Sequence, residues 1–263
     1  MEVSTYHTHT CYSDGKNTPE EMLKKAISLG MREYGFSDHA PMIFSCEWDT
    51  KVRTIESYKR VVLDLKEKYK DEIKVYLGIE QDYYSVPAQD YEYIIGSVHY
   101  IQKNGVYLPL DASVDKTKEN IDKYYNGDAL AYCEDYYELV GDLYNKTKCH
   151  IIGHFDLITK FNEIEPLIDT THPRYIKAYT GALKKLKDTP VIYEINTGAI
   201  SRGYRTSPYP SDEMIDIIAK QGKPFVICSD THSTETIDFN LEKEKERLKQ
   251  KGYSYITSLS QIL

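Results

Sequence analysis

The feature that most constrains the fold of this chain is a regular alternation of short β-rich runs with longer helical patterns. The expected strands cover residues 3–8, 33–37, 73–79, 91–98, 150–153, 191–195 and 225–229, with a weaker eighth over 253–257. The expected helices cover 19–29, 54–69, 117–144, 173–186, 211–221 and 235–251. Alternation of this kind predicts parallel strands joined by crossover helices. Seven or eight such units indicate an α/β barrel rather than an open sheet.

The sequence gives no reason to divide the chain. It contains no repeat, low-complexity segment or Pro/Gly/Ser-rich linker, so we expect one domain over residues 1–263. No apolar run reaches the ~18 residues of a membrane span, and no secretory signal pattern is visible. The five cysteines contain no C-x-x-C pair. Reduced thiols and a cytoplasmic location are therefore expected.

Histidines and acidic residues gather at the C-terminal ends of the expected strands. They are His7, His9, His39, His99, His154 and His232, together with Asp14, Asp38, Glu80 and Asp230. In a parallel barrel these ends converge on one face, which is where active sites lie. His150 and His172 lie outside the pattern, and we expect both to be structural.

Two pairs of these residues have a local meaning as well. His7 and His9 are two positions apart, as are Asp230 and His232, and such residues on a strand point to the same side. Imidazole nitrogens and carboxylate oxygens together suit Zn, Mn, Fe or Co better than Ca or Mg. We interpret Asp38 separately, as a residue that orients a ligand or as a cap.

The number of candidate ligands predicts the number of ions. The nine candidates are His7, His9, Asp14, His39, Glu80, His99, His154, Asp230 and His232. One metal ion uses about 4–6 ligands and keeps positions open for water and substrate. Nine ligands exceed the need of one ion and are generous for two, so about three ions fit best, with Glu80 bridging two of them.

A metal cluster of this kind predicts hydrolysis of a phosphate ester, because metals acidify bound water and neutralise the phosphoryl oxygens. We expect a metal-bridging hydroxide to attack phosphorus in line, without a phosphoenzyme. Glu80, Asp230 and His232 are expected to serve catalysis as well as metal binding. The sequence contains no D-x-D, C-x5-R or R-H-G motif of other phosphatases, and no nucleotide-binding glycine motif.

Three basic residues are candidates for contact with the phosphate. Lys160 follows the expected strand before His154, and Arg202 and Arg205 follow the strand at 191–195. An arginine can bind a phosphate through two parallel hydrogen bonds. The alternative for all three is solvated loop charge, most of all for Arg205. The loops 42–53 and 101–116 could line the organic half of the pocket.

Six segments together resemble the polymerase-and-histidinol-phosphatase (PHP) superfamily and, more narrowly, its histidinol-phosphate phosphatases. They are residues 7–10 (HTHT), 35–41 (GFSDHAP), 78–80 (GIE), 96–99 (GSVH), 153–157 (GHFDL) and 229–232 (SDTH). The resemblance runs from residue 5 to 232. It implies a distorted (β/α)7 barrel that hydrolyses L-histidinol phosphate to L-histidinol and phosphate in histidine biosynthesis.

The same resemblance implies how the ligands divide among the ions. His7, His9, Glu80 and Asp230 would hold one ion. Glu80, His99 and His154 would hold the second, and Asp14, His39 and His232 the third. The family pattern often has an arginine where this chain has Lys160, a change that keeps the charge but loses the forked geometry.

Two other readings keep the ligands but change the function. The first is a phosphoesterase or exonuclease that acts on nucleotides or nucleic-acid ends. The net charge of −8 and the lack of a basic stripe disfavour long polymers, so no nucleic-acid partner is expected, but small nucleotides stay possible. The second is a regulatory or metal-storage protein without turnover, which the adjacent basic residues disfavour.

Overall fold

The strands form a curled parallel sheet. A computed structural model describes residues 4–46 and 52–263. The order in the sheet is β1-β2-β3-β6-β7-β8, and every neighbouring pair is parallel. The bounds are β1 Glu33–Phe36, β2 Lys74–Asp82, β3 Tyr93–Ser97, β6 Ile151–Ile152, β7 Ile192–Asn196 and β8 Phe225–Cys228. Each of these strands overlaps an expected one.

The N-terminal segment closes the sheet into a barrel. Thr5 forms a parallel bridge with Tyr34 of β1, and Thr8 forms one with Thr231, just beyond β8. The His9 amide also donates to the carbonyl of Thr231 at 2.8 Å. The segment thus stands where a seventh strand belongs, between the two edges of the sheet. The fold is a distorted (β/α)7 barrel, as expected.

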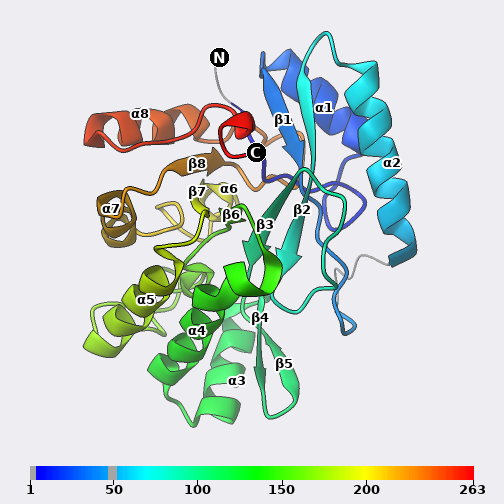
Figure 1. Cartoon of the computed structure of the whole chain (residues 1–263). Coiled ribbons are helices and arrows are strands. Elements are labelled where there is room, and N and C mark those ends of the chain that lie inside the picture. The colour runs from blue at the N-terminus through cyan, green and yellow to red at the C-terminus, as the bar shows by residue number, and fades with distance from the viewer. Residues whose placement is uncertain (1–3, 47–51) are drawn as a thin grey trace.

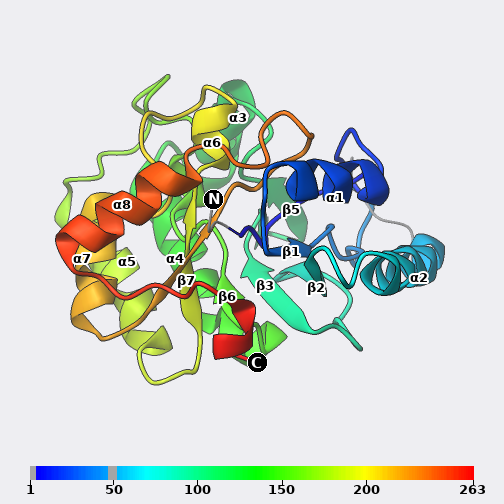
Figure 2. The same cartoon turned by 90° about the horizontal axis from the view of Figure 1, so that it is seen from above.

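Helices cover the outside of the barrel (Figures 1 and 2). They are α1 Pro19–Ser28, α2 Val52–Lys68, α3 Val114–Tyr125, α4 Ala129–Thr147, α5 Pro173–Leu186, α6 Gly198–Ser201, α7 Asp212–Lys220 and α8 Leu241–Lys251, with the 3-10 turns η1 Leu157–Thr159 and η2 Leu259–Gln261. Thr18 begins α1 with a reciprocal capping box to Glu21. The bounds of α5 match the expected 173–186.

Three expectations about the elements were wrong. The expected helix 117–144 is two helices, because Asn126 and Gly127 take positive φ and Asp128 caps α4. The expected helix 235–251 begins only at Leu241. The weak eighth strand is a single bridge between Tyr255 and Phe225.

A hairpin that the sequence reading missed lies directly after β3. It consists of β4 Tyr100–Lys103 and β5 Val106–Pro109, paired antiparallel. Asn104 and Gly105 turn it with φ of 51° and 78°, as an Asn-Gly turn between two strands requires. The hairpin extends from the end of the barrel toward which β3 runs (Figure 1).

Two further structural findings concern the described residues. No helix among them has both the length and the apolar character to cross a membrane. None of the five cysteines, all of which lie in the described ranges, forms a disulfide.

Tyr93 belongs to a cluster of buried residues and packs against two glycines. The Tyr93 hydroxyl donates to the carbonyl of Phe36 at 3.0 Å, and its ring is fully buried. A Cβ placed on Gly78 would lie 2.2 Å from the Tyr93 ring, and one on Gly35 would lie 2.4 Å from its hydroxyl. Glycine at these positions therefore makes room for the ring.

We expect Gly78→Ala to destabilise the protein by about 1–3 kcal/mol, because the added methyl group overpacks the barrel interior. The measurement is the free energy of unfolding in denaturant. Gly181→Ala is the matched control, since a Cβ on Gly181 in α5 meets nothing within 4 Å. This control should be neutral or stabilising, by up to about 1 kcal/mol. Equal effects of the two changes would contradict the packing argument.

Candidate metal centre

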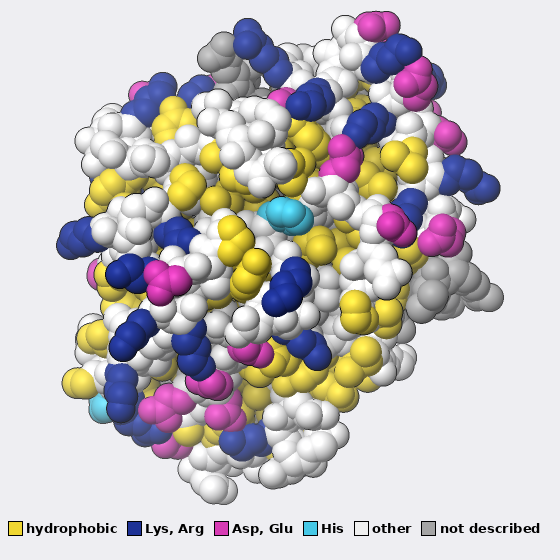
Figure 3. Space-filling view, viewed as in Figure 1, with side chains coloured by type: hydrophobic (Ala, Val, Ile, Leu, Met, Phe, Trp, Pro, Cys, Tyr) yellow, Lys and Arg dark blue, Asp and Glu magenta, His cyan; other side chains and the backbone are white. Residues whose placement is uncertain are grey.

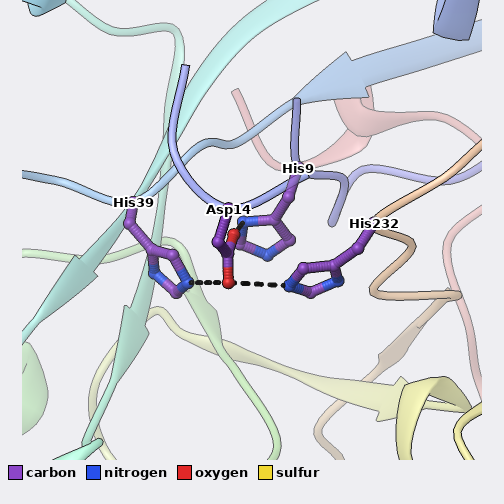
Figure 4. Close-up of side chains that lie close together, drawn as sticks. All are labelled: His9, Asp14, His39 and His232. Atoms are coloured by element: carbon purple, nitrogen blue, oxygen red, sulfur yellow. Dashed lines mark hydrogen bonds and ion pairs between the residues drawn. The ribbon is translucent and has the colours of Figure 1, made fainter. Parts of the chain in front are cut away.

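All nine expected ligands come together at the C-terminal ends of the strands. They form four overlapping groups, each with ligand atoms within 4.8 Å of one another. The groups are His9, Asp14, His39 and His232 (Figure 4); His7, His9 and Asp230; His7, Glu80 and His154; and His39, Glu80 and His99. Asp14 is exposed and His232 is half-buried, whereas the other seven are buried.

The strand ends place these side chains. His7 and His9 come from the closing segment, His39 follows β1, Glu80 lies in β2, His99 follows β3, His154 follows β6, and Asp230 and His232 follow β8. Asp230 has a φ of 48°, a left-handed conformation that costs energy in a residue other than glycine. Such strain concentrates at functional sites, where the surrounding contacts hold it.

Glu80 is the centre of the cluster. It is 1% exposed, and its two oxygens face different histidines. Oε2 lies 2.9 Å from His39 Nδ1 and 3.3 Å from His7 Nε2, while Oε1 lies 3.0 Å from His154 Nε2. This geometry allows the one carboxylate to bridge two ions.

Two further acids, in strands of the sheet, contact the histidine ligands or their backbone. Glu194 of β7 lies 2.7 Å from His7 Nδ1 and accepts the backbone N–H of His154 at 2.9 Å. Asp82 accepts the backbone N–H of His99 at 2.6 Å. Such partners fix ring orientation around metals. The sequence reading missed Glu194 and Asp82, although both lie in the strands that carry the ligands.

Asp38 acts as the orienting residue that the sequence suggested. Its carboxylate accepts the Thr10 amide at 2.8 Å, the Thr10 hydroxyl at 2.7 Å and the Ser13 hydroxyl at 2.5 Å. These bonds hold the turn that carries Asp14.

The charges in the cluster depend on one another. Burial would raise the pKa of Glu80, but the imidazoles of His7, His39 and His99 hold it well below its usual range. Burial would likewise raise the pKa of Asp230, and Arg202 and His7 outweigh that effect. Burial, together with His232 and His39, lowers the pKa of His9 to about 3, so this imidazole is neutral. Burial would lower the pKa of His7 and His39, but the surrounding carboxylates, Glu80 among them, raise it well above its usual value. The ionised carboxylates and the neutral His9 are in the states that metals bind, whereas an ion must displace a proton from His7 and His39.

The buried polar atoms of the cluster fit divalent metal ions. His7 Nε2, His9 Nδ1 and His154 Nδ1 are buried and make no hydrogen bond with any described residue, although ionisable groups lie close to the first two. Buried polar atoms left in this way are costly unless something pairs with them. Imidazole and carboxylate donors in this arrangement suit divalent transition metals.

A pocket of about 220 Å³ opens onto the cluster, and two of the three expected basic residues line it. Lys160 Nζ donates to the Asp111 carbonyl at 3.0 Å and lies 3.2 Å from its carboxylate. Arg202 donates to the carbonyl of Asp230 at 2.9 Å and to its carboxylate at 3.1 Å. The sequence reading did not single out Asp111, which follows the unexpected hairpin.

The structure does not bring the third basic residue, Arg205, into this pocket. Its guanidinium is buried, donates to Thr159 at 2.8 Å, lies 3.3 Å from Asp156 and stacks 4.3 Å from the Tyr209 ring. It lines a separate cavity beside η1. A buried acid in the adjacent loop takes up its charge, so we drop Arg205 from the phosphate contacts.

The two histidines outside the pattern have structural contacts. His172 caps α5, and its Nδ1 accepts the backbone N–H of Arg174 at 3.1 Å. His150 Nδ1 accepts the backbone N–H of Ile94 at 3.1 Å.

Two proteins similar in sequence and one similar in structure are named as histidinol or histidinol phosphate phosphatases. A Schizosaccharomyces pombe relative named "Probable histidinol-phosphatase" is 25% identical, covering 100% of this chain and 90% of the relative. The "Histidinol-phosphatase" of Bacillus subtilis is 24% identical, covering 94% and 100%. The solved histidinol phosphate phosphatase of Lactococcus lactis, complexed with zinc, L-histidinol and phosphate, superimposes with a TM-score of 0.73 at 18% identity, covering 97% of this chain and 95% of that one.

The family itself follows from the extent of its match. The PHP domain matches residues 5–198, which is most of the chain and includes seven of the nine clustered residues. Asp230 and His232 lie beyond the match but in the same cluster. The chain belongs to the PHP domain family.

Proposed function

We propose that this protein is a metal-dependent histidinol-phosphatase, which hydrolyses L-histidinol phosphate to L-histidinol and phosphate. The observation that carries the hydrolase assignment is the buried cluster of nine ligands beside a pocket lined by Lys160 and Arg202. The substrate is supported by the names of the relatives and by the L-histidinol and phosphate in the Lactococcus lactis structure.

The residues of the site have two tasks, which are metal binding and phosphate binding. The nine clustered side chains would hold about three divalent ions, with Glu80 shared between two of them. When bound, such ions supply an activated water and neutralise the charge on the phosphoryl oxygens. Asp230 and His232 hold the edge of the cluster that faces the pocket, and Lys160 and Arg202 orient the phosphate. The division of the nine ligands among three ions, which the family resemblance implies, is part of this proposal.

We propose further that the chain acts as one domain in the cytoplasm. Its C-terminal end is tied to the barrel, since the Ser258 hydroxyl donates to Glu33 at 2.7 Å and the Leu259 amide does so at 3.1 Å. The five thiols without a disulfide accord with a reducing compartment.

The face of the molecule in Figure 3 has mixed rather than purely basic charge. On the face in Figure 3, lysine and arginine side chains are interspersed with aspartate and glutamate. A polynucleotide site would need basic residues gathered into a stripe. Small nucleotides remain the alternative that a substrate panel tests.

Chelation of the purified protein should abolish phosphatase activity, and added Mn, Co or Zn should restore it. Elemental analysis should give about three transition-metal ions per chain, because nine protein ligands exceed the need of one or two. The assay is a panel of phosphomonoesters that includes L-histidinol phosphate and nucleoside monophosphates. Activity that survives complete metal removal, or that prefers nucleotides, would overturn the proposal.

Glu80→Ala should be the most damaging single change to a ligand, since the carboxylate faces histidines on both sides. We expect loss of bound metal and of nearly all turnover, measured by elemental analysis and initial rates. His172→Ala is the control. It removes a helix cap at a typical cost of about 1 kcal/mol but should keep full metal content and activity. The reverse result would show that the site lies elsewhere.

Lys160→Ala should separate phosphate binding from metal binding. The described contacts of its ammonium group are with Asp111 and two aromatic rings, so metal content should stay intact. We expect kcat/KM to fall about ten- to hundredfold, as for loss of a hydrogen bond to a charged group. Lys160→Arg should keep or improve activity. An unchanged kcat/KM in Lys160→Ala would show that this lysine holds Asp111 and does not contact the phosphate.

A further inference from the structure

The cavity that Arg205 lines is separate from the metal pocket and has no role in the proposed reaction. Its volume is about 380 Å³, within the range of roughly 300–1,000 Å³ that is usual for small-molecule sites. Helices α5 and α7, which lie next to each other outside the barrel, provide part of its lining (Figures 1 and 2). Among the described residues that line it, none is one of the nine clustered ligands.

Two buried polar atoms of this cavity are left without a hydrogen bond. Nε of Arg205 and Oδ1 of Asp156 make none with any described residue, although these residues are only 8% and 1% exposed. The ion pair between them joins other atoms, since Arg205 Nη1 lies 3.3 Å from Asp156 Oδ2. A donor and an acceptor thus remain unsatisfied side by side, which costs free energy when both are buried. A ligand with both an acceptor and a donor would satisfy them.

Charges of both signs surround the cavity. The positive charge comes from Arg205 and from the N-terminal ends of α5 and α7, both of which contribute residues of their first turn. Ser211 begins α7 without a side-chain cap, so it leaves the first amides of that helix to other acceptors. The negative charge comes from Asp156, Glu163 and Glu213. A ligand with a single charge would be attracted by one part of this lining and repelled by the other.

We propose that this cavity binds a free α-amino acid in its zwitterionic form. The carboxylate of the ligand accepts from Arg205 Nε and from the first turn of α7, and its ammonium group donates to Asp156 Oδ1. Tyr179 and Met214 also line the cavity and offer apolar surface to the side chain of the ligand. An α-amino acid carries these three groups on one carbon, as the short distance between Arg205 and Asp156 requires.

The amino-acid site and the metal pocket share a wall, which consists of residues 156–160 and 202–205. Asp156, Thr159 and Arg205 line the amino-acid site, whereas Leu157, Lys160, Arg202 and Tyr204 line the metal pocket. Arg205 Nη1 joins the two segments by donating to the Thr159 hydroxyl at 2.8 Å. Because Lys160 follows Thr159 directly, a ligand that holds Arg205 also steadies the segment that carries Lys160.

A bound amino acid should therefore strengthen phosphate binding, since each ligand orders a wall that the other also needs ordered. Such coupling is reciprocal, so phosphate should tighten amino-acid binding by the same factor. The coupling rests on the proposed function, in which Lys160 and Arg202 bind phosphate. Binding of the amino acid itself does not depend on that function.

The first test is calorimetric titration of the metal-loaded protein with each standard L-amino acid. At least one should bind with a dissociation constant of about 1 mM or less. The amine and the carboxylic acid that correspond to this amino acid each lack one charge, and each should bind at least about tenfold more weakly. Lack of binding by every amino acid, or equal binding by a singly charged analogue, would overturn the proposal.

Two variants locate the bound amino acid. Arg205→Lys keeps a positive charge beside Asp156 but loses Nε, so binding should weaken about tenfold or more. Ile176→Trp enlarges a side chain that lines the cavity and is 39% exposed, so it should block binding and keep the metal content. Leu63→Trp is the matched control, because Leu63 is 50% exposed in α2, away from the cavity, and should leave binding unchanged. Wild-type affinity in both Arg205→Lys and Ile176→Trp would overturn the site.

The coupling is measured by titration with inorganic phosphate, with and without a saturating concentration of the amino acid. The amino acid should lower the dissociation constant of phosphate several-fold, and phosphate should lower that of the amino acid by the same factor. A dissociation constant of phosphate that stays unchanged or rises would overturn the coupling. Failure to hydrolyse L-histidinol phosphate would instead overturn the proposed function, and the calorimetric titration would still decide the amino-acid site.

Discussion

The interaction on which the rest of the structure depends is the burial of the Glu80 carboxylate among imidazoles. An isolated carboxylate at 1% exposure is costly, because it loses its hydration. Five histidines have a ring nitrogen within 3.6 Å of its oxygens and offset part of that cost: His7, His9, His39, His99 and His154. Several buried histidine nitrogens of the cluster still make no hydrogen bond with any described residue, and bound divalent cations would satisfy them. The barrel serves to bring these groups into a space that no single segment could enclose.

Around the cluster, three further acids fix the positions of ligand side chains and of the backbone that carries them. Glu194 and Asp82 hold the rings and backbone of ligands from the sheet side, while Asp38 holds the turn that carries Asp14. On the open side, Arg202 and Lys160 supply positive charge, and Asp111 supplies a negative charge next to Lys160. The site therefore changes from buried ligands at its base to paired charges on its open side.

The sequence was informative where periodicity and strand ends coincide. The six sheet strands and the nine clustered residues could be predicted, because parallel strands must end on one face. The break at Asn126 was missed although the sequence carries its signal, because Asn126-Gly127 is a helix-ending pair and Asp128 is an N-cap residue. Arg205 resembled Arg202 in sequence, yet a buried Asp156 that is distant in the chain took its charge. Asp111 was hidden because its place depends on a hairpin that was not recognised.

The closing segment has a consequence for synthesis of the chain. His7 and His9 are made more than 200 residues before their neighbours in the cluster, Asp230 and His232. A nascent chain therefore carries ligands that cannot form the complete centre until the last strand has left the ribosome. An ion bound both by the closing segment and by the residues after β8 would crosslink the barrel where these two segments meet. Metal supply would then influence how long a finished chain stays closed, in addition to whether it turns over substrate.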